Sequence, residues 1–197
     1  MLLSSSPYLR LCFNSLCGLA SVNHLHFHIY YHHQNLALET IPLRRVTANS
    51  VAFLLNDVRK NTTCRGFAFQ ILGFDDIDLV CDTITKIAGR FLDKDVAYNL
   101  YATRGTNFEK EIQNEDTQYS ALRIFLWPRK KYVGAKTPTL EKSLSFNIAA
   151  CELAGHLILH DQFTFDQLTE ETAMELFREV AVDDQTWANL VTFVAGL

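Results

Sequence analysis

Polar and apolar side chains alternate over residues 22–31, where Leu25 and Phe27 separate three histidines. A period of two is typical of a β-strand with one buried face, so we expect a strand over this stretch. Residues 8–13 are also rich in apolar and aromatic side chains and predict an earlier strand. The small and polar residues over 14–18 predict a turn after it.

The rest of the chain changes period several times. Residues 75–93 carry apolar side chains at helical spacing after an acidic start, which favours a helix. Thr169 and Asp183 have the side chains of helix N-caps and predict helices over 169–180 and 183–196. The other predicted elements are a strand over 66–73, a pair of strands over 97–103 and 121–127 ended by Pro128, a strand or short helix over 145–159, and loop with one short strand over 34–65.

Strands and helices are segregated along the chain instead of alternating one by one. This order favours an antiparallel α+β fold over a parallel, doubly wound sheet. No Pro/Gly/Ser-rich linker divides the 197 residues. We therefore expect a single α+β domain over residues 1–197, a length that suffices for a substantial core.

Composition narrows the classes of partner. Apolar residues make up 48% of the chain and charged residues 20%, as in ordinary globular proteins. The net charge of -4 gives no reason to expect nucleic acid or an anionic membrane as a partner. The chain has no apolar run of the ~18–20 residues that a membrane span needs, and no signal-peptide pattern. We expect a cytoplasmic protein.

Five cysteines are spread along the chain without any CxxC pair. This spacing excludes a zinc ribbon and a thioredoxin-type motif. Free, buried thiols are the expected state in a reducing compartment.

His24, His26 and His28 are the strongest chemical signal, because alternation places their imidazoles on one side of the predicted strand. Three interpretations are open: structural histidines, a metal site of HxH type, and a covalent nucleophile for phosphoryl or nucleotidyl transfer. The third needs groups that hold phosphate oxygens. The preceding turn offers backbone N–H groups, and Asn14 and Ser21 add side-chain donors. We favour the transfer interpretation and predict neither metal nor cofactor.

The segment His24-x-His26-x-His28, preceded by Gly18 and Ser21, resembles the histidine-triad superfamily of nucleotide hydrolases and transferases. Further blocks resemble the GDP-D-glucose phosphorylase family, whose plant relatives are GDP-L-galactose phosphorylases. These blocks are Pro7-Tyr8-Leu9-Arg10, Ala97-Tyr98-Asn99-Leu100, Arg123-Ile124-Phe125-Leu126-Trp127-Pro128-Arg129 and Cys151-Glu152-Leu153-Ala154-Gly155-His156. The resemblance implies a histidine-triad-like antiparallel half-barrel sheet with flanking helices.

The resemblance also implies a reaction. GDP-D-glucose and inorganic phosphate give GDP and D-glucose 1-phosphate through a guanylylated His26, with His28 assisting at the phosphate or leaving group. His24 supports His26 through its backbone carbonyl, and Asn14 and Ser21 contact the substrate phosphates. The alternatives are a histidine-triad hydrolase of nucleotide conjugates and a non-catalytic remnant that binds guanine nucleotides.

This chain also departs from the family pattern. Family members carry a long region before the histidines, so we expect a sheet that is incomplete at the amino-terminal side. Cys17 stands where glycine is usual, in a turn expected to need positive φ. His156 is expected to be structural or to form the far wall of the site, whereas Arg104 and Arg123 are phosphate binders or solvated or core-capping arginines.

Overall fold

A seven-stranded antiparallel sheet forms the centre of the computed structural model, which describes residues 4, 6–55, 64–109, 119–133 and 146–197. The strand order is β2-β1-β6-β7-β5-β4-β3, and neighbouring strands run antiparallel throughout. The strands are β1 (Leu9–Asn14), β2 (His28–Tyr31), β3 (Arg44–Arg45), β4 (Phe53–Leu55), β5 (Gly66–Ile71), β6 (Ala97–Gly105) and β7 (Ala121–Arg129).

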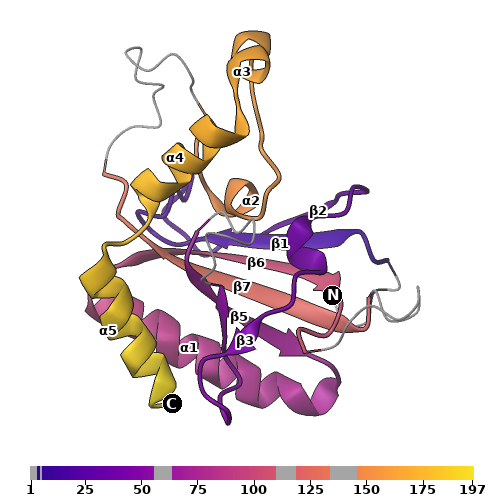
Figure 1. The fold of residues 1–197 in the computed structure, drawn as a ribbon, viewed down its shortest axis with the longest axis vertical. Coiled ribbons are helices and arrows are strands. Elements are labelled where there is room, and N and C mark those ends of the chain that lie inside the picture. Colours follow the sequence, from indigo (N-terminus) through magenta and orange to yellow (C-terminus); the bar gives the residue numbers. More distant parts are fainter. Residues whose placement is uncertain (1–3, 5, 56–63, 110–118, 134–145) are drawn as a thin grey trace.

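Helices cover both faces of this sheet (Figure 1). They are α1 (Ile77–Asp93), α2 (Ala150–Leu153), α3 (Gln162–Gln167), α4 (Glu170–Val180) and α5 (Asp184–Ala195), with 3₁₀ turns η1 (Ala37–Glu39) and η3 (Phe74–Asp76). Among the described residues the sheet stays open and does not close into a barrel. The predicted antiparallel α+β class is confirmed.

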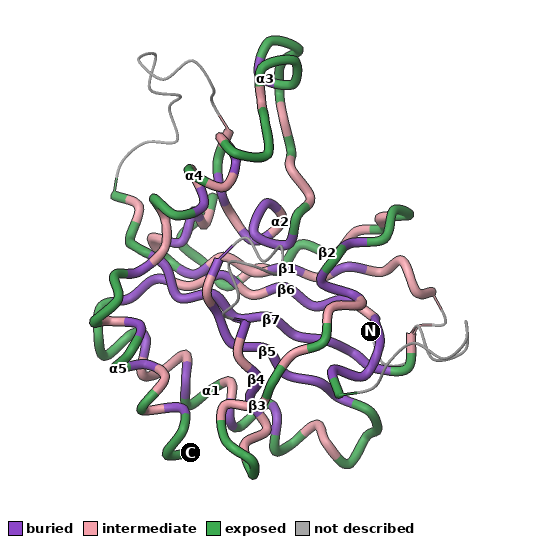
Figure 2. The backbone as a smooth tube through the Cα atoms, viewed as in Figure 1, coloured by how far each residue is buried: buried purple, intermediate pink, exposed green. Residues whose placement is uncertain are grey.

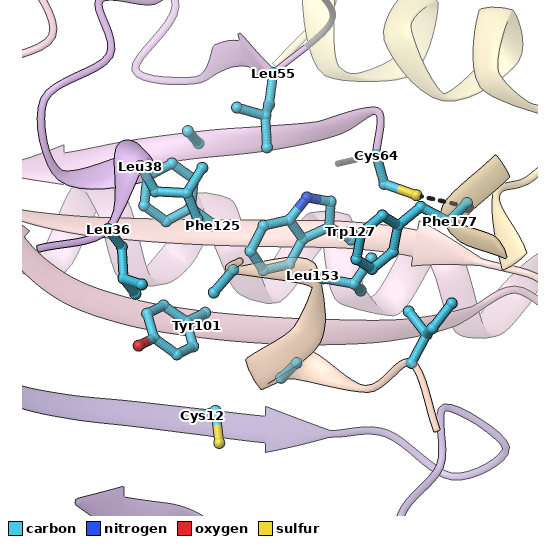
Figure 3. Packing of buried hydrophobic residues seen from close by; sticks show 14 of the residues in the cluster. Cys12, Leu36, Leu38, Leu55, Cys64, Tyr101, Phe125, Trp127, Leu153 and Phe177 are labelled. Atoms are coloured by element: carbon cyan, nitrogen blue, oxygen red, sulfur yellow. Dashed lines mark hydrogen bonds between the residues drawn. The ribbon is translucent and has the colours of Figure 1, made fainter. Parts of the chain in front are cut away.

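Each face of the sheet has its own hydrophobic core. On one face Phe67 of β5 packs with Phe91 of α1 and Trp187 of α5. On the other, Trp127 of β7 belongs to a cluster with residues of α2 and α4, among them Phe177 (Figure 3). Because both faces are covered, β5 and β7 are buried along their whole length, whereas the edge strand β2 is mostly exposed (Figure 2).

The helix starts follow the predicted caps. Thr169 accepts a hydrogen bond from the N–H of Thr172, and Asp183 accepts one from Thr186, at 3.2 and 2.8 Å. Asp161 caps α3 in the same way through Thr164, a helix that the sequence pattern did not predict. Such caps satisfy N–H groups that the first helical turn leaves unpaired.

Several predicted elements need correction. The strand predicted over 22–31 is reduced to β2, because residues 21–27 have no ladder partner. Pro128 does not end its strand: β7 continues to Arg129. Its pairing with β5 ends at Leu126, so the missing N–H of proline is tolerated there. The described part of residues 34–65 contains two short strands, β3 and β4, instead of one.

A strand or a short helix is expected over residues 145–159, and the structure has a short helix within this range. Residues 150–153 form α2, whereas Ser145 lies outside the described residues. Glu152 closes the first turn by accepting from the N–H of Ala149 at 2.8 Å. Among the helices that the structure describes, none has the length and apolar character of a membrane span.

A fully buried ion pair ties β1 to η1. Arg10 Nη2 lies 2.5 Å from Glu39 Oε1, and both side chains have 0% exposure. Thr103 of β6 also donates its hydroxyl to Glu39 Oε1 at 3.0 Å. Despite the positive charge of Arg10, burial raises the pKa of the Glu39 carboxyl, which indicates that desolvation is the larger effect.

Candidate active site

The turn between β1 and the histidines is fixed onto β6. Ser15 exchanges two hydrogen bonds with Tyr98, since its N–H donates to the Tyr98 carbonyl at 3.0 Å and its Oγ accepts from the Tyr98 N–H at 2.8 Å. Asn99 Nδ2 donates to the carbonyl of Gly18 at 2.7 Å. A Cβ on Gly18 would lie 2.7 Å from the Tyr98 oxygen, so only glycine fits this close approach. These contacts hold the turn that precedes the histidine segment against β6.

Two non-glycine residues of this turn adopt left-handed backbone conformations. Cys17 has φ 60° and Leu19 has φ 69°. The sequence prediction of a positive φ at Cys17 is therefore confirmed. Left-handed backbone at a residue with a Cβ is strained by ~1 kcal/mol.

Replacing Cys17 by glycine is expected to raise the free energy of unfolding by about 0.5–1 kcal/mol, because the strain of the Cβ is removed. Leu16→Gly is the matched control in the same turn: Leu16 is exposed and has no positive φ, so only the entropic cost of glycine remains and stability should fall. Urea denaturation of the two variants tests this difference. Equal destabilisation by both would contradict it.

The three histidine rings stay together although only His28 lies in a strand. The ring centroids of His24 and His26 are 5.3 Å apart, and those of His26 and His28 are 5.0 Å apart. His24 and His26 precede β2 in an irregular, largely exposed segment. Alternation therefore predicted correctly that the rings gather, but not that a strand carries all three.

His26 has a hydrogen bond on each ring nitrogen. Nδ1 lies 3.2 Å from the backbone carbonyl oxygen of His24, and Nε2 lies 3.4 Å from Oγ of Ser21. Because a carbonyl oxygen only accepts hydrogen bonds, Nδ1 carries the ring proton and donates it. Nε2 then holds the free electron pair and accepts from the Ser21 hydroxyl. In this tautomer Nε2 is the ring nitrogen of His26 whose chemistry permits nucleophilic attack.

Asn14, the last residue of β1, hydrogen-bonds to neighbouring elements of the fold. Its Oδ1 accepts from Asn99 Nδ2 at 2.6 Å and from the N–H of Ala150 at 3.1 Å. It therefore links β1, β6 and the start of α2. The substrate contact predicted for Asn14 stays a prediction, and its carbonyl oxygen is engaged within the fold.

His156 closes a polar network that runs from α2 to β2. The Tyr30 hydroxyl lies 3.3 Å from His156 Nδ1 and 3.2 Å from the hydroxyl of Tyr101, and the ring of His32 stacks on His156 at 4.2 Å. Tyr30 is not among the predicted site residues, although the period of two from His28 places it on the histidine side. Alternation was the signal that could have found it.

The His32–His156 pair gives a pH-dependent stability. Burial lowers the pKa of both imidazoles, and their mutual repulsion lowers that of His32 further, with Arg10 and His33 adding to it. Both rings are thus favoured neutral in the folded state, so their contribution is present above the unfolded pKa of about 6.5 and is lost as the pH falls below it.

We expect the free energy of unfolding to decrease between about pH 7 and about pH 5. Chemical denaturation at a series of pH values measures this, and His156→Gln should reduce the slope. The exposed His160 supplies the control variant, His160→Gln, which should keep the wild-type slope. A His156→Gln profile identical to wild type would contradict the assignment.

The two candidate arginines differ in their surroundings. Arg123 is fully buried and donates to the backbone carbonyls of Thr106, Leu38 and Ile41 at 2.6–2.9 Å. Burial lowers the pKa of Arg123 to about 9. It is therefore a core-capping arginine. Arg104 is half-buried and donates from Nη2 to the Ser4 carbonyl at 2.9 Å.

Metal-ligating side chains do not converge in the described part of the chain: no three His, Cys, Asp or Glu side chains there lie together as metal ligands would. The five cysteines are all free. Of these, Cys12 and Cys64 are buried as expected, but Cys81 is exposed on α1.

Comparison with known proteins adds a family to this geometry. A family model described as "GDPGP1-like, C-terminal domain" matches residues 61–197, and one described as "GDPGP1-like, N-terminal domain" matches residues 1–30. The second match includes the three histidines. Both matched regions contribute strands to the same sheet, since β1 pairs with β6.

Curated relatives are similar over nearly the whole chain. GDP-D-glucose phosphorylase 1 of Danio rerio is 36% identical over 190 residues, covering 96% of this chain and 52% of the relative. The Homo sapiens protein of the same name is 35% identical, covering 91% and 44%. GDP-L-galactose phosphorylase 2 of Arabidopsis thaliana is 25% identical, covering 97% and 41%. The chain spans about half the length of these relatives, and no solved structure matches it.

Proposed function

Because the chain belongs to the GDPGP1-like family, we propose that its histidine segment transfers the guanylyl group of a GDP-hexose to inorganic phosphate. The observation that carries this proposal is the orientation of His26. Its Nδ1 is held by the His24 carbonyl, and its Nε2 is left with a free electron pair beside Ser21. A fixed imidazole with one free nitrogen is what nucleophilic attack on phosphorus requires.

In the first step, Nε2 of His26 attacks the α-phosphorus of the GDP-hexose. A nitrogen–phosphorus bond forms, and the bond from the α-phosphorus to the bridging oxygen breaks. The hexose 1-phosphate leaves with that oxygen and its electron pair. The Nδ1 proton stays on the ring, so the guanylylated imidazole is cationic and the His24 carbonyl stabilises it.

In the second step, an oxygen of inorganic phosphate attacks the same phosphorus. The nitrogen–phosphorus bond breaks, GDP forms, and the electron pair returns to Nε2. Two in-line displacements restore the enzyme, as in other covalent transfer mechanisms. Phosphate as acceptor, instead of water, distinguishes the phosphorylase from a hydrolase.

The neighbouring residues support these steps. Ser21 lies at the nucleophilic nitrogen, where its hydroxyl can donate to a phosphate oxygen once substrate replaces its contact with the ring. The imidazole of His28 lies 5.0 Å from that of His26 between centroids, and this proximity supports a role for His28 as donor to the phosphate or the leaving oxygen. His24 acts through its backbone, and Asn14 is the remaining predicted contact to the substrate.

The substrate proposed first is GDP-D-glucose. Two relatives named GDP-D-glucose phosphorylase 1 are 35% and 36% identical to this chain, whereas the plant GDP-L-galactose phosphorylase 2 is 25% identical. The higher identity favours the glucose compound as the donor. A direct competition between the two GDP-hexoses measures the preference.

GDP-D-glucose labelled with ³²P at the α-phosphorus tests the function. We expect label on the protein, stable to alkali and labile to acid as a phosphoramidate is, and its release as GDP after phosphate is added. Release as GMP without phosphate would identify a hydrolase of nucleotide conjugates. Retention of labelled GDP-glucose on the protein without covalent transfer would identify a guanine-nucleotide-binding protein instead.

A further inference from the structure

Two cysteines from distant parts of the sequence lie in contact. The Sγ of Cys12, in β1, is 3.6 Å from the Sγ of Cys151, in α2. Both are free thiols. Cys12 belongs to the same core cluster as Tyr101 (Figure 3), and Cys151 packs against that cluster. The proposed guanylyl transfer uses neither cysteine.

The two thiols have different surroundings. Cys12 has 2% exposure, whereas Cys151 is only half-buried. The Tyr30 hydroxyl donates to Cys151 Sγ at 3.5 Å. The pKa of Cys151 is lowered by its hydrogen bond with Cys12 and by the Tyr30 hydroxyl, although burial opposes this effect. The pKa of Cys12 is raised by the same hydrogen bond with Cys151 and by burial. Of the two thiols, Cys151 therefore ionises more readily, and the Tyr30 hydroxyl beside it stabilises its thiolate form.

We propose that Cys12 and Cys151 form a redox-active pair that hydrogen peroxide converts into a reversible disulfide. Their different exposure to solvent and their contact give the two cysteines different roles. The half-buried Cys151 meets the oxidant, and the buried Cys12 resolves the product without itself needing access to solvent.

Hydrogen peroxide oxidises the two thiols in two steps. The Cys151 thiolate attacks one peroxide oxygen, the O–O bond breaks, and Cys151 sulfenic acid and hydroxide form. The sulfur of Cys12 then attacks the sulfur of Cys151, the S–O bond breaks, and hydroxide leaves. The Cys12 proton and one from solvent convert the two hydroxides into water. Two thiols are oxidised by two electrons, and one peroxide is reduced.

The required movement is small. A disulfide needs its sulfurs about 2.05 Å apart, so the two atoms must approach by roughly 1.5 Å. Cys12 lies within the sheet between β2 and β6, whereas α2 is a four-residue helix. The new bond would join α2 to the β1 position that pairs with His28. Directly opposed residues of an antiparallel pair project to the same face, so the bond would lie beside the His28 side chain. Its formation does not depend on guanylyl transfer.

The test uses the full chain without any substitution. The protein is treated with hydrogen peroxide, denatured, blocked with N-ethylmaleimide and digested without reduction, and its peptides are analysed by mass spectrometry. We expect a cross-linked peptide pair containing Cys12 and Cys151, and a loss of two of the five titratable thiols that dithiothreitol reverses. Oxidation of Cys81 while Cys12 and Cys151 both stay reduced would overturn the proposal.

Two variants sharpen the assignment. Cys81→Ser removes the exposed thiol of α1 and should leave the cross-link unchanged. Cys12→Ala removes the resolving thiol, so Cys151 sulfenic acid should accumulate and react with dimedone. Circular dichroism checks that this variant is folded. Over-oxidation of Cys151 to sulfinic acid in the unsubstituted chain, without any cross-link, would also overturn the proposal.

Discussion

Replacing His26 by asparagine should abolish both covalent labelling by α-³²P GDP-D-glucose and phosphorolysis. Asparagine keeps a hydrogen-bonding group of similar size but has no nucleophilic nitrogen. Loss of a covalent nucleophile lowers kcat by on the order of 10⁶-fold in a well-studied case, so we expect no detectable turnover. Autoradiography of the protein and chromatography of the released nucleotide measure the two effects.

The control is His160→Asn, which makes the same change at an exposed histidine outside the histidine segment. It should keep wild-type labelling. His28→Asn should retain covalent label but form it about 10²–10⁴-fold more slowly, as expected for loss of a proton donor or phosphate contact. Undiminished labelling of His26→Asn would show that another residue is the nucleophile.

Replacing Glu39 by leucine should lower the free energy of unfolding by about 3–5 kcal/mol, the largest stability effect that we predict. The change leaves the fully buried Arg10 guanidinium without its carboxylate and removes the nearer of two acceptors of the Thr103 hydroxyl. Urea denaturation followed by far-UV circular dichroism measures the loss. The matched control is Glu109→Leu, which breaks the more exposed pair with Arg45 and should cost under about 1 kcal/mol.

A double variant, Arg10→Met with Glu39→Leu, should recover most of the lost stability. Arg10 Nε and Glu39 Oε2 are buried without a hydrogen-bond partner among the described residues, so the pair is imperfectly satisfied. Replacing both charges by apolar side chains therefore removes two desolvation costs together. A double variant less stable than Glu39→Leu alone would show that the ion pair itself is strongly stabilising.

Local sequence signals predicted the long helices α1, α4 and α5 and the long strands well. The caps Thr169 and Asp183 begin α4 and α5 as expected, and apolar spacing places α1 within two residues of its observed start. These elements depend on residues close in sequence, so local chemistry suffices. The short strands β3 and β4 depend on pairing with each other and with β5, which no local pattern reveals.

The histidine segment shows the limit of periodicity. Alternation describes which side of the chain each residue occupies, but a strand also needs a neighbour for its backbone. Residues 21–27 have no ladder partner, and Leu25 is 75% exposed although the pattern predicted its burial. The gathering of the three rings was predictable, whereas their irregular backbone was not.

The partners of the buried charges were the least predictable feature, although a core-capping role was among the expectations for Arg123. Arg10, Glu39 and Arg123 are fully buried, although charged side chains are usually found at the surface. Their partners are residues far away in sequence, such as the Leu38 carbonyl for Arg123. Only the folded topology brings these acceptors together, so neither composition nor residue spacing predicts these contacts.

The contact that orients His26 is made by the main chain of His24, not by its imidazole. The side chain at position 24 can therefore change during evolution without altering which ring nitrogen of His26 is free, provided that the backbone path persists. Insertions, deletions or a proline between positions 24 and 26 would be selected against more strongly than a change of side chain. The orientation of the His26 ring thus depends on the backbone conformation between positions 24 and 26. A comparison of residue identities alone would not reveal this dependence.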